Sequence, residues 1–501
     1  MTVTTPAPAA ALHHWAGGAP VDGESGRFAD VTDPAGTARP CDLLVTAAWV
    51  ITVDADRRIL RDGGIAVTGD TIVAVGKAAD LDREFTPARR IDRPDSVVLP
   101  GMANGHRHLL CCAKGAMPEG GTTLQSLRRF IYPSFSSLEP EDMNVYARHA
   151  TAEMIRNGTT LFEEPGCNHI DAVLPAIAES GMRARIGLWT WDQRGSGGSD
   201  GLPDWLRLDT AAAIRRLEDG LATVQAFGNA RIRPAVCVEG VTTCSDELTV
   251  AAARLAEESR TLAVQHKSTS QREVELELKV FGERPVKHTA SIKALNEYTL
   301  LNHVTSLDAD DVAAIADSGA TVSWNPSTAL KLAKGTTQHS RFPELVAAGV
   351  PMGLGTDAEN CSNHQDICRA IYLAALLPRD AREDPGAVSA ETAVELGTLG
   401  GARALRFDDV TGSLEPGKQA DIVVFDTDDY DWRPLHNPIA NLAYGVTGHS
   451  VDTVLIGGEV VLENKKSTVF DEDALREEVE ATDRRILNKI GIDPSPAWPV
   501  I

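Results

Sequence analysis

The sequence predicts an α/β fold, a (β/α)8 barrel of the TIM type joined to a small composite β-sandwich domain formed from both chain ends. Two observations carry this expectation. Eight short apolar segments alternate with helical patterns over residues 97–404. Segments rich in β-forming residues, with Gly and Asp at their turns, flank this middle part in 41–96 and in 405–465. We therefore expect the barrel at 97–404 and the composite β domain at 41–96 and 405–465.

The eight expected barrel strands are 96–101, 159–165, 183–189, 232–240, 261–269, 299–306, 321–326 and 351–357. Helical patterns lie between them, as in 143–158, 209–228 and 308–319, and each of these three ends at a glycine that can stop a helix. An open, doubly wound sheet is the alternative. No GxGxxG sequence follows the first strand, so a dinucleotide site is weakly supported.

The two ends of the chain are expected to lie outside these domains. Residues 1–40 are rich in Ala, Pro, Gly and Thr, which predicts a tail or a surface arm. Residues 466–501 begin with a charged amphipathic pattern at 470–491, which predicts a C-terminal helix followed by a tail.

Composition excludes several classes of partner. The 48 basic and 71 acidic side chains give a net charge of −23, which argues against binding to nucleic acid or to an anionic membrane surface. No segment approaches the ~20 consecutive apolar residues of a membrane span, and the first residues lack the pattern of a signal peptide. The eight cysteines show no regular spacing. We predict a cytoplasmic protein with reduced thiols.

Side chains of the metal-ligand type follow four of the expected strands. His106 and His108 follow the first strand, His266 ends the fifth, His303 ends the sixth and Asp357 ends the eighth. The carboxyl ends of barrel strands meet at one face, so these side chains are expected to converge. The i, i+2 spacing of the first pair directs both imidazoles to one side of an extended segment. Three imidazoles and a carboxylate suit Zn²⁺ or Fe²⁺, with one position open for water.

The chain resembles the amidohydrolase superfamily, in the branch that holds cytosine and guanine deaminases, S-adenosylhomocysteine deaminase and the triazine chlorohydrolases. The resemblance extends from about residue 41 to 465. It is carried by LPGMANGHRH (99–108), EMIRNGTTLFEE (153–164), SWNPSTALKLAKG (323–335), GVPMGLGTDAENCSNHQD (349–366) and GSLEPGKQADIVVFD (412–426).

The resemblance implies a role for each strand-end residue. His106, His108 and His266 are metal ligands, and Asp357 is both a ligand and the proton shuttle. His303 orients the attacking water or the tetrahedral centre. The cofactor is one divalent ion, for which we favour zinc over iron. The substrate is a small N-heterocycle, and the family is commonly homo-oligomeric.

One departure from the branch concerns the fifth strand. The deaminases carry His-x-x-Glu there, and the Glu protonates a ring nitrogen of the substrate. This chain has Thr269 at that position. Three explanations are open. Another carboxylate takes the place of the missing Glu, the substrate needs no ring protonation, or the reaction is not a deamination. The candidate carboxylates near strand ends are Glu163, Glu164, Glu239 and Glu359.

Substrate contacts are expected from two further segments. The loop 109–135 follows the first strand, and its Gln125 best matches a substrate-contacting residue of the family. Trp324 and Asn325 lie at the end of the expected seventh strand, and Thr328-Ala329 follows in place of the Ser-Asn that the branch often has. Trp324 could form a flat wall for a planar ring. With Thr269 and Glu239, these residues complete the predicted substrate site.

Three functions are compatible with these residues. The favoured one is a deaminase-type aminohydrolase that uses a metal-activated water. The alternative removes chloride or an alkylamine from a triazine-like ring, or opens a cyclic amide, and chloride departs with less help from an acid. A non-catalytic barrel that only binds is the remote alternative. Its expected mark is loss of the ligand residues, and all five are present.

Overall fold

The computed structural model describes residues 14–16, 19–21, 38–110, 112–193, 208–240 and 242–499. Most of the arm expected at 1–40 lies outside this range. Two short segments of the arm are described, and these strands, β1 (His14–Ala16) and β2 (Ala19–Val21), pair in an antiparallel manner. The rest of the described chain, from Pro40 onward, is one compact unit.

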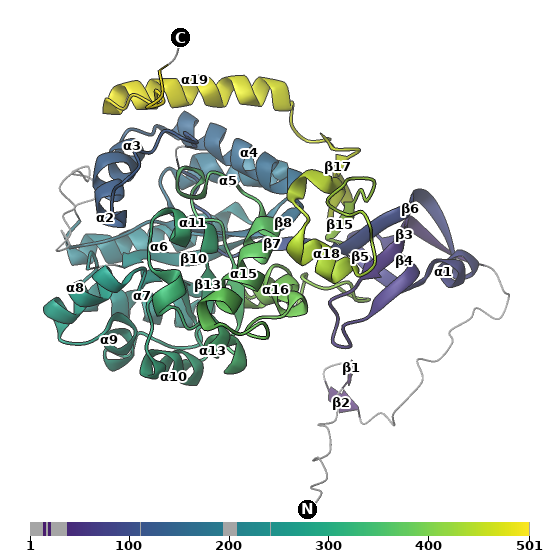
Figure 1. Ribbon diagram of the computed structural model, residues 1–501, viewed down its shortest axis with the longest axis horizontal. Coiled ribbons are helices and arrows are strands. Elements are labelled where there is room, and N and C mark those ends of the chain that lie inside the picture. Colours follow the sequence, from purple (N-terminus) through teal and green to yellow (C-terminus); the bar gives the residue numbers. More distant parts are fainter. Residues whose placement is uncertain are drawn as a thin grey trace, which may run out of the picture. The chain divides into compact units, whose positions relative to one another are not determined.

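Eight parallel strands form the barrel (Figure 1). Each strand pairs with the next one in sequence, and the N–H of Gly105 donates to the carbonyl of Leu354 at 2.7 Å, which connects the last strand back to the first. The predicted (β/α)8 barrel is therefore confirmed. The strands are β7 (Met102–Asn104), β8 (Thr159–Cys167), β9 (Arg183–Leu188), β10 (Ile232–Gly240), β11 (Leu262–Lys267), β12 (Thr299–His303), β13 (Thr321–Trp324) and β14 (Met352–Leu354).

The first barrel strand is not the segment predicted for it. Residues 96–101 were expected there, but Val97–Pro100 pair with Ile422–Phe425 in the other sheet, as the end of β6 (Phe85–Pro100). The barrel strand begins two residues later, at Met102. Between them, Gly101 lies so close to Thr160 that a Cβ would come within 2.0 Å of the Thr160 hydroxyl. A side chain at residue 101 would collide with Thr160, so glycine is needed where the chain crosses from the β domain to the barrel.

Helices follow the barrel strands, and the three helical patterns of the sequence are among them. Gly228 and Gly319 end α6 and α10 in the left-handed conformation, as their positions predicted. The helices of at least ten residues here are α4 (Pro140–Arg156), α5 (Ile170–Ser180), α6 (Thr210–Phe227), α7 (Asp246–Glu258), α8 (Gln271–Phe281), α10 (Ala309–Ser318) and α15 (Ile367–Arg382).

The second domain is a continuous eight-stranded sheet drawn from both parts of the chain, in the order β18-β17-β16-β15-β6-β3-β4-β5. Arg183 of β9 joins it to the barrel. Its guanidinium donates to both carboxylate oxygens of Asp421, at 2.7 and 2.8 Å, and both side chains are buried. The strands are β3 (Arg39–Ile51), β4 (Ile59–Thr68), β5 (Thr71–Lys77), β6, β15 (Ile422–Phe425), β16 (Val451–Ile456), β17 (Glu459–Glu463) and β18 (Lys466–Ser467).

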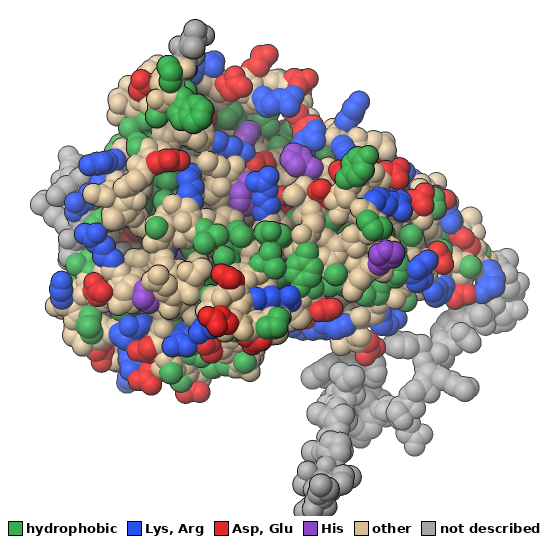
Figure 2. Space-filling model, viewed as in Figure 1, with side chains coloured by type: hydrophobic (Ala, Val, Ile, Leu, Met, Phe, Trp, Pro, Cys, Tyr) green, Lys and Arg blue, Asp and Glu red, His purple; other side chains and the backbone are tan. Residues whose placement is uncertain are grey.

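The predicted terminal helix is α19 (Glu472–Ile490), which packs along α4. Leu475 and Val479 are on its buried side, and Tyr146 of α4 donates to Asp483 at 2.7 Å. No helix in the described parts of the chain is long and apolar enough to cross a membrane. Acidic and basic side chains are interspersed over the face drawn in Figure 2, as expected for charges that serve mainly to keep the surface solvated.

Candidate functional site

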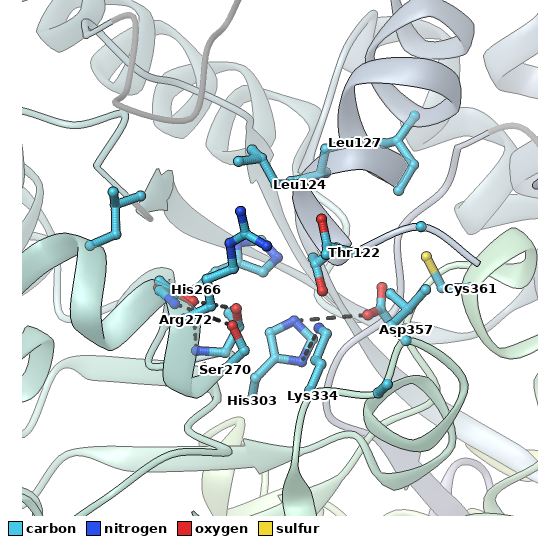
Figure 3. A pocket seen from close by; sticks show the side chains of 18 of the residues that line it. Thr122, Leu124, Leu127, His266, Ser270, Arg272, His303, Lys334, Asp357 and Cys361 are labelled. Carbon is cyan, nitrogen blue, oxygen red and sulfur yellow. Dashed lines mark hydrogen bonds and ion pairs between the residues drawn. The ribbon is translucent and has the colours of Figure 1, made fainter. Parts of the chain in front are cut away.

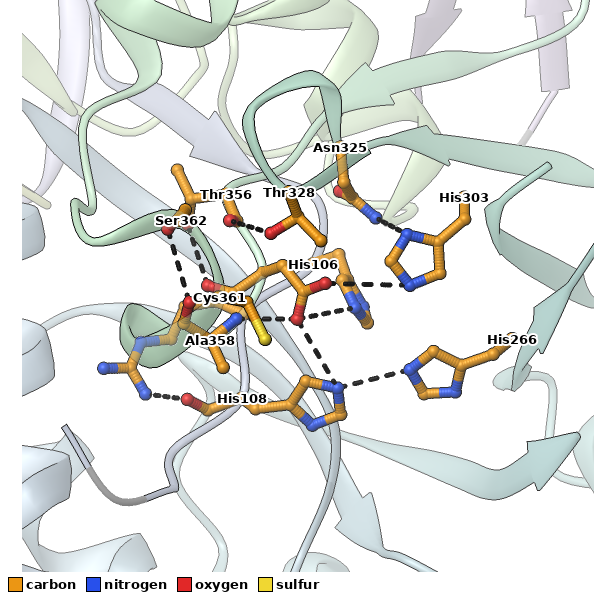
Figure 4. Close-up of polar contacts among 12 residues, drawn as sticks. His106, His108, His266, His303, Asn325, Thr328, Thr356, Ala358, Cys361 and Ser362 are labelled. Carbon is orange, nitrogen blue, oxygen red and sulfur yellow. Dashed lines mark hydrogen bonds and ion pairs between the residues drawn. The ribbon is translucent and has the colours of Figure 1, made fainter. Parts of the chain in front are cut away.

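The four predicted histidines converge at the carboxyl ends of the barrel strands (Figure 4), and Asp357 lies within 4.0 Å of three of them. All five side chains are buried. The N–H of Asp357 donates to the carbonyl of His106 at 2.9 Å, which fixes the end of β14 against the end of β7. His303, Val304 and Asp357 have φ angles of 75°, 39° and 63°, in the left-handed region that residues with a Cβ rarely adopt. The surrounding packing therefore holds part of the site in a strained backbone.

Ligand atoms of three histidines and the aspartate face a common centre. His108 Nε2 lies 3.2 Å from His266 Nε2. Asp357 Oδ1 lies 3.7 Å from His106 Nε2 and 4.0 Å from His108 Nε2. The predicted ligand set is thus brought together in one cluster.

The hydrogen bonds around the cluster suit a metal ion. His266 Nδ1 lies 2.9 Å from the carbonyl of Glu239, so Nδ1 carries the hydrogen and Nε2 presents its lone pair to the centre. Neither ring nitrogen of His106 has a hydrogen-bond partner among the described residues. Buried polar atoms are normally satisfied, so these orphaned nitrogens fit coordination to a cation.

Burial keeps the imidazoles neutral. It lowers the pKa of His106 and of His108 well below the usual value, and lowers the pKa of His266 to about 4. The neutral imidazole is the form that binds a metal, so the residues fit the ion without loss of a proton from these rings.

His303 differs from the other three histidines because two donors face its Nδ1. Asn325 Nδ2 lies 3.0 Å away and Lys334 Nζ lies 3.5 Å away. A lysine ammonium can only donate, so Nδ1 accepts and Nε2 carries the hydrogen. Burial, with help from the Lys334 charge, also lowers the pKa of His303 well below its usual value. His303 therefore presents a neutral Nε2–H, 3.8 Å from Asp357 Oδ2.

A cavity of about 850 Å³ opens onto the cluster (Figure 3). Thr122, Leu124 and Leu127, from the segment that follows the first strand, line one side. Arg272 of α8 and Lys334 line another, and Lys334 is buried. The cavity therefore combines an apolar wall with charged and polar groups beside the reactive centre, as small-molecule sites do.

Two buried carboxyl groups, Glu273 and Glu239, line this cavity in addition to Asp357 and the exposed Glu275. Glu273 Oε2 accepts hydrogen bonds from the backbone N–H of Thr269 at 2.7 Å and from its hydroxyl. Glu239 accepts from Thr243 and, at 3.3 Å, from Tyr132. Burial raises the pKa of Glu273 to about 7, with Glu277 adding to the rise, and raises the pKa of Glu239 to about 8. Both groups can therefore hold a proton near neutral pH.

The other carboxylates considered from the sequence have different surroundings. Glu163 Oε2 lies 3.5 Å from His106 Nδ1 inside the barrel. Glu164 accepts from the N–H groups of Leu109 and Gly166. Glu359 is paired with a buried arginine. None of these three lines the cavity within the described residues, whereas Glu239 does.

The predicted substrate residues fall into two groups. Thr269 and Glu239 line the cavity, and the side-chain amide of Asn325 donates a hydrogen bond to Nδ1 of His303. Trp324 instead stacks on Phe342, with ring centroids 4.1 Å apart. Gln125 forms a capping box with Thr122 at the start of α2 (Thr123–Ser126), and its side chain is exposed. The structure therefore brings three of the five to the reactive centre.

Glu273 and Lys334 are among the cavity residues that were not predicted. Glu273 lies four residues after Thr269, in the first turn of α8, and Ser270-x-x-Glu273 has the spacing of a helix start, which does not by itself indicate a position in the cavity. Lys334 lies within the segment 323–335 that carried the resemblance.

The sequence profile of the amidohydrolase family matches residues 97–461. The 5-methylthioadenosine/S-adenosylhomocysteine deaminase of Nitratidesulfovibrio vulgaris is 31% identical over 456 residues, which cover 90% of this chain and 99% of that protein. The enzyme of the same name from Syntrophobacter fumaroxidans is 32% identical over 448 residues, covering 89% and 98%.

Solved structures agree with the fold. An adenosine deaminase from Xanthomonas campestris with bound zinc has a TM-score of 0.83 at 28% identity, covering 90% of this chain and all of that one. An atrazine chlorohydrolase from Arthrobacter aurescens, complexed with zinc and atraton, has a TM-score of 0.77 at 23% identity, covering 88% and 100%. With the profile match and the convergent His and Asp residues, these similarities show that the chain belongs to the amidohydrolase family of hydrolytic enzymes.

Proposed function

We propose that this enzyme is a metal-dependent aminohydrolase, which replaces an amino group on a carbon of a small N-heterocycle by oxygen and releases ammonia. One observation carries the proposal: the carboxyl of Glu273, held by Thr269, lines the same cavity as the His and Asp cluster. Glu273 supplies the acid that is missing at position 269, where this chain has Thr in place of Glu. The deaminase names of relatives that match nearly the whole chain support the same reaction.

His106, His108, His266 and Asp357 would hold one divalent ion, for which we favour zinc, and the ion would lower the pKa of a water molecule so that it can attack as hydroxide. The bound zinc of the adenosine deaminase structure supports this choice.

Asp357 is the proton shuttle in this proposal. The N–H of Ala358 donates to its Oδ1 at 2.7 Å, which fixes the carboxylate and leaves Oδ2 toward His303. Asp357 accepts one proton from the attacking water and delivers it to the departing amino group, which leaves as ammonia.

His303 stabilises the oxygen that attacks the ring carbon. Its Nδ1 is occupied by Asn325 and Lys334, so only Nε2–H faces Asp357 and the reactive centre. This hydrogen donates to the oxygen as negative charge develops there. Because the ring is held in place before the reaction, the donation needs no reorganisation in the transition state.

Glu273 donates a proton to the ring nitrogen next to the attacked carbon. Its Oε2 is occupied by Thr269, whereas Oε1 is buried and has no hydrogen-bond partner among the described residues. The ring nitrogen accepts the electron pair that the attack displaces, so protonation there lowers the barrier. When ammonia leaves, the new hydroxyl returns a proton to Glu273, and the product is a lactam.

An assay of the leaving group tests the proposal. The purified enzyme, loaded with Zn²⁺, is incubated with aminopurines and their nucleosides, aminopyrimidines, chloro- and alkylamino-triazines, and cyclic amides. Ammonia and chloride are measured alongside loss of substrate. We expect one ammonia per product from an amino-substituted ring. Turnover of a triazine with release of chloride or alkylamine, and no ammonia from any amino-substituted ring, would overturn it.

A further inference from the structure

A second cluster of metal-ligand side chains lies outside the catalytic one. Cys112 belongs to the loop after β7, His149 to α4, and Glu359 begins α14 (Glu359–Ser362). One ligand atom of each lies within 4.8 Å of the others. None of these three residues lines the cavity of the catalytic site.

The spacing of these atoms matches a metal polyhedron. Cys112 Sγ lies 3.4 Å from His149 Nδ1, and His149 Nδ1 lies 3.5 Å from Glu359 Oε2. Around a tetrahedral zinc ion, with bonds of about 2.3 Å to sulfur and about 2.0 to 2.2 Å to nitrogen and oxygen, these edges measure about 3.5 and about 3.4 Å. An ion can therefore bind with little movement of the side chains.

Hydrogen bonding alone accounts poorly for the arrangement. Both contacts use the same ring nitrogen of His149, and one N–H cannot donate well to a sulfur and an oxygen at once. Glu359 is 1% exposed, and its Oε2 has no hydrogen-bond partner among the described residues. Arg107 occupies only Oε1. The Oε2 atom of this buried carboxylate is thus directed at the other two ligands, and its contact with His149 Nδ1, at 3.5 Å, is too long or poorly aligned for a hydrogen bond.

The cluster has a route to solvent and a matching charge. The His149 side chain is 21% exposed and lines a separate cavity of about 420 Å³, beside Lys114 and Glu153. Those two residues form an ion pair with each other at 2.7 Å. A thiolate and a carboxylate together balance a divalent cation, and water from the cavity can complete the coordination.

We propose that Cys112, His149 and Glu359 form a second site for a divalent transition-metal ion of borderline softness, such as Zn²⁺ or Co²⁺, distinct from the catalytic centre. On binding, the Cys112 thiol releases its proton to solvent and the sulfur binds as thiolate. His149 binds through the Nδ1 lone pair, with its hydrogen on Nε2. The ion joins the loop after β7, α4 and α14, and so anchors the segments next to His108 and Asp357.

Metal content and the spectrum of the cobalt protein test this site. The full-length protein is stripped of metal, saturated with Zn²⁺ or Co²⁺, and freed of excess ion by gel filtration. We expect two ions per chain. In the cobalt protein we also expect a near-ultraviolet charge-transfer band from thiolate to metal, because the catalytic ligand set contains no thiolate.

Matched variants assign the second ion. Cys112→Ser removes the band, and both Cys112→Ser and His149→Gln lower the content from two ions to one. Cys361→Ser, which alters the cysteine lining the catalytic cavity, keeps the band, and Cys41→Ser, at a buried thiol of the β domain, keeps two ions. One ion per chain in the wild type with no thiolate band overturns the proposal, whether or not the variants fold. A band that survives Cys112→Ser also overturns it.

Discussion

The buried carboxyl of Glu273 accepts two hydrogen bonds from Thr269, one from its backbone N–H at 2.7 Å and one from its hydroxyl. A threonine cannot act as an acid at neutral pH, but here it orients a carboxyl that can. The position that lacks the expected glutamate therefore supports another glutamate in the same cavity.

Replacing that carboxyl tests its role as the acid. Glu273→Gln should lower kcat by a factor of about 10² to 10⁴, because an amide does not donate a proton to the ring. Steady-state kinetics on the best amino-substituted substrate measure this. Glu257→Gln, on the exposed side of α7, is the control and should stay within about twofold of the wild type. A wild-type rate in Glu273→Gln would exclude Glu273 as the donor.

The pH dependence follows from the raised pKa of Glu273, about 7. The acid must be protonated to act, so kcat/KM should fall as the pH rises through about 7. The hydrogen bond from the Thr269 hydroxyl lowers this pKa, so Thr269→Ala, which removes that bond and keeps the one from the backbone N–H, should shift the alkaline limb to higher pH. Rates at about pH 5 to 9 show the shift. An alkaline limb that stays in place in Thr269→Ala, or moves downward, would contradict the assignment.

Asp357→Asn separates proton transfer from folding. The amide preserves the size of the side chain but cannot accept the proton of the attacking water, so turnover should fall by at least about 10³-fold. Circular dichroism and the thermal transition should resemble those of the wild type. If the variant turned over at the wild-type rate, another group would have to be the shuttle.

Arg183 joins the barrel to the composite β domain, and its removal should destabilise the protein. Arg183→Met leaves the buried Asp421 carboxylate without its cation, which typically costs about 3 to 5 kcal/mol. Urea denaturation should show a lower midpoint. Arg83→Met breaks an exposed pair with Asp80 and should change the free energy of unfolding by less than about 1 kcal/mol. Equal effects of the two substitutions would refute this role.

The sequence was sufficient for the barrel and for its His and Asp cluster, because the carboxyl ends of parallel strands must meet at one face. It was not sufficient for the acid: whether Glu273 reaches Thr269 depends on how the first turn of α8 leaves β11. It was also not sufficient for the start of the first barrel strand, because the chain crosses between the two sheets at Gly101, where the close contact is with Thr160, a residue distant in sequence. The homo-oligomer and the cytoplasmic location stay predictions.

Gln125 shows a different kind of difficulty. Thr122 and Gln125 have the Thr-x-x-Gln spacing of a helix capping box, and the structure contains that box. The local signal was therefore present in the sequence, whereas the resemblance to the family predicted a substrate contact at Gln125.

The left-handed backbone at His303, Val304 and Asp357 lowers the stability of the fold at positions that include two proposed catalytic residues. Each such residue typically costs about 1 to 3 kcal/mol, and glycine would relieve that strain. Glycine at 303 or 357 would also remove the groups that carry out the reaction. Selection of this protein for heat resistance alone would therefore tend to enrich inactive variants, and directed evolution should screen for turnover at every round.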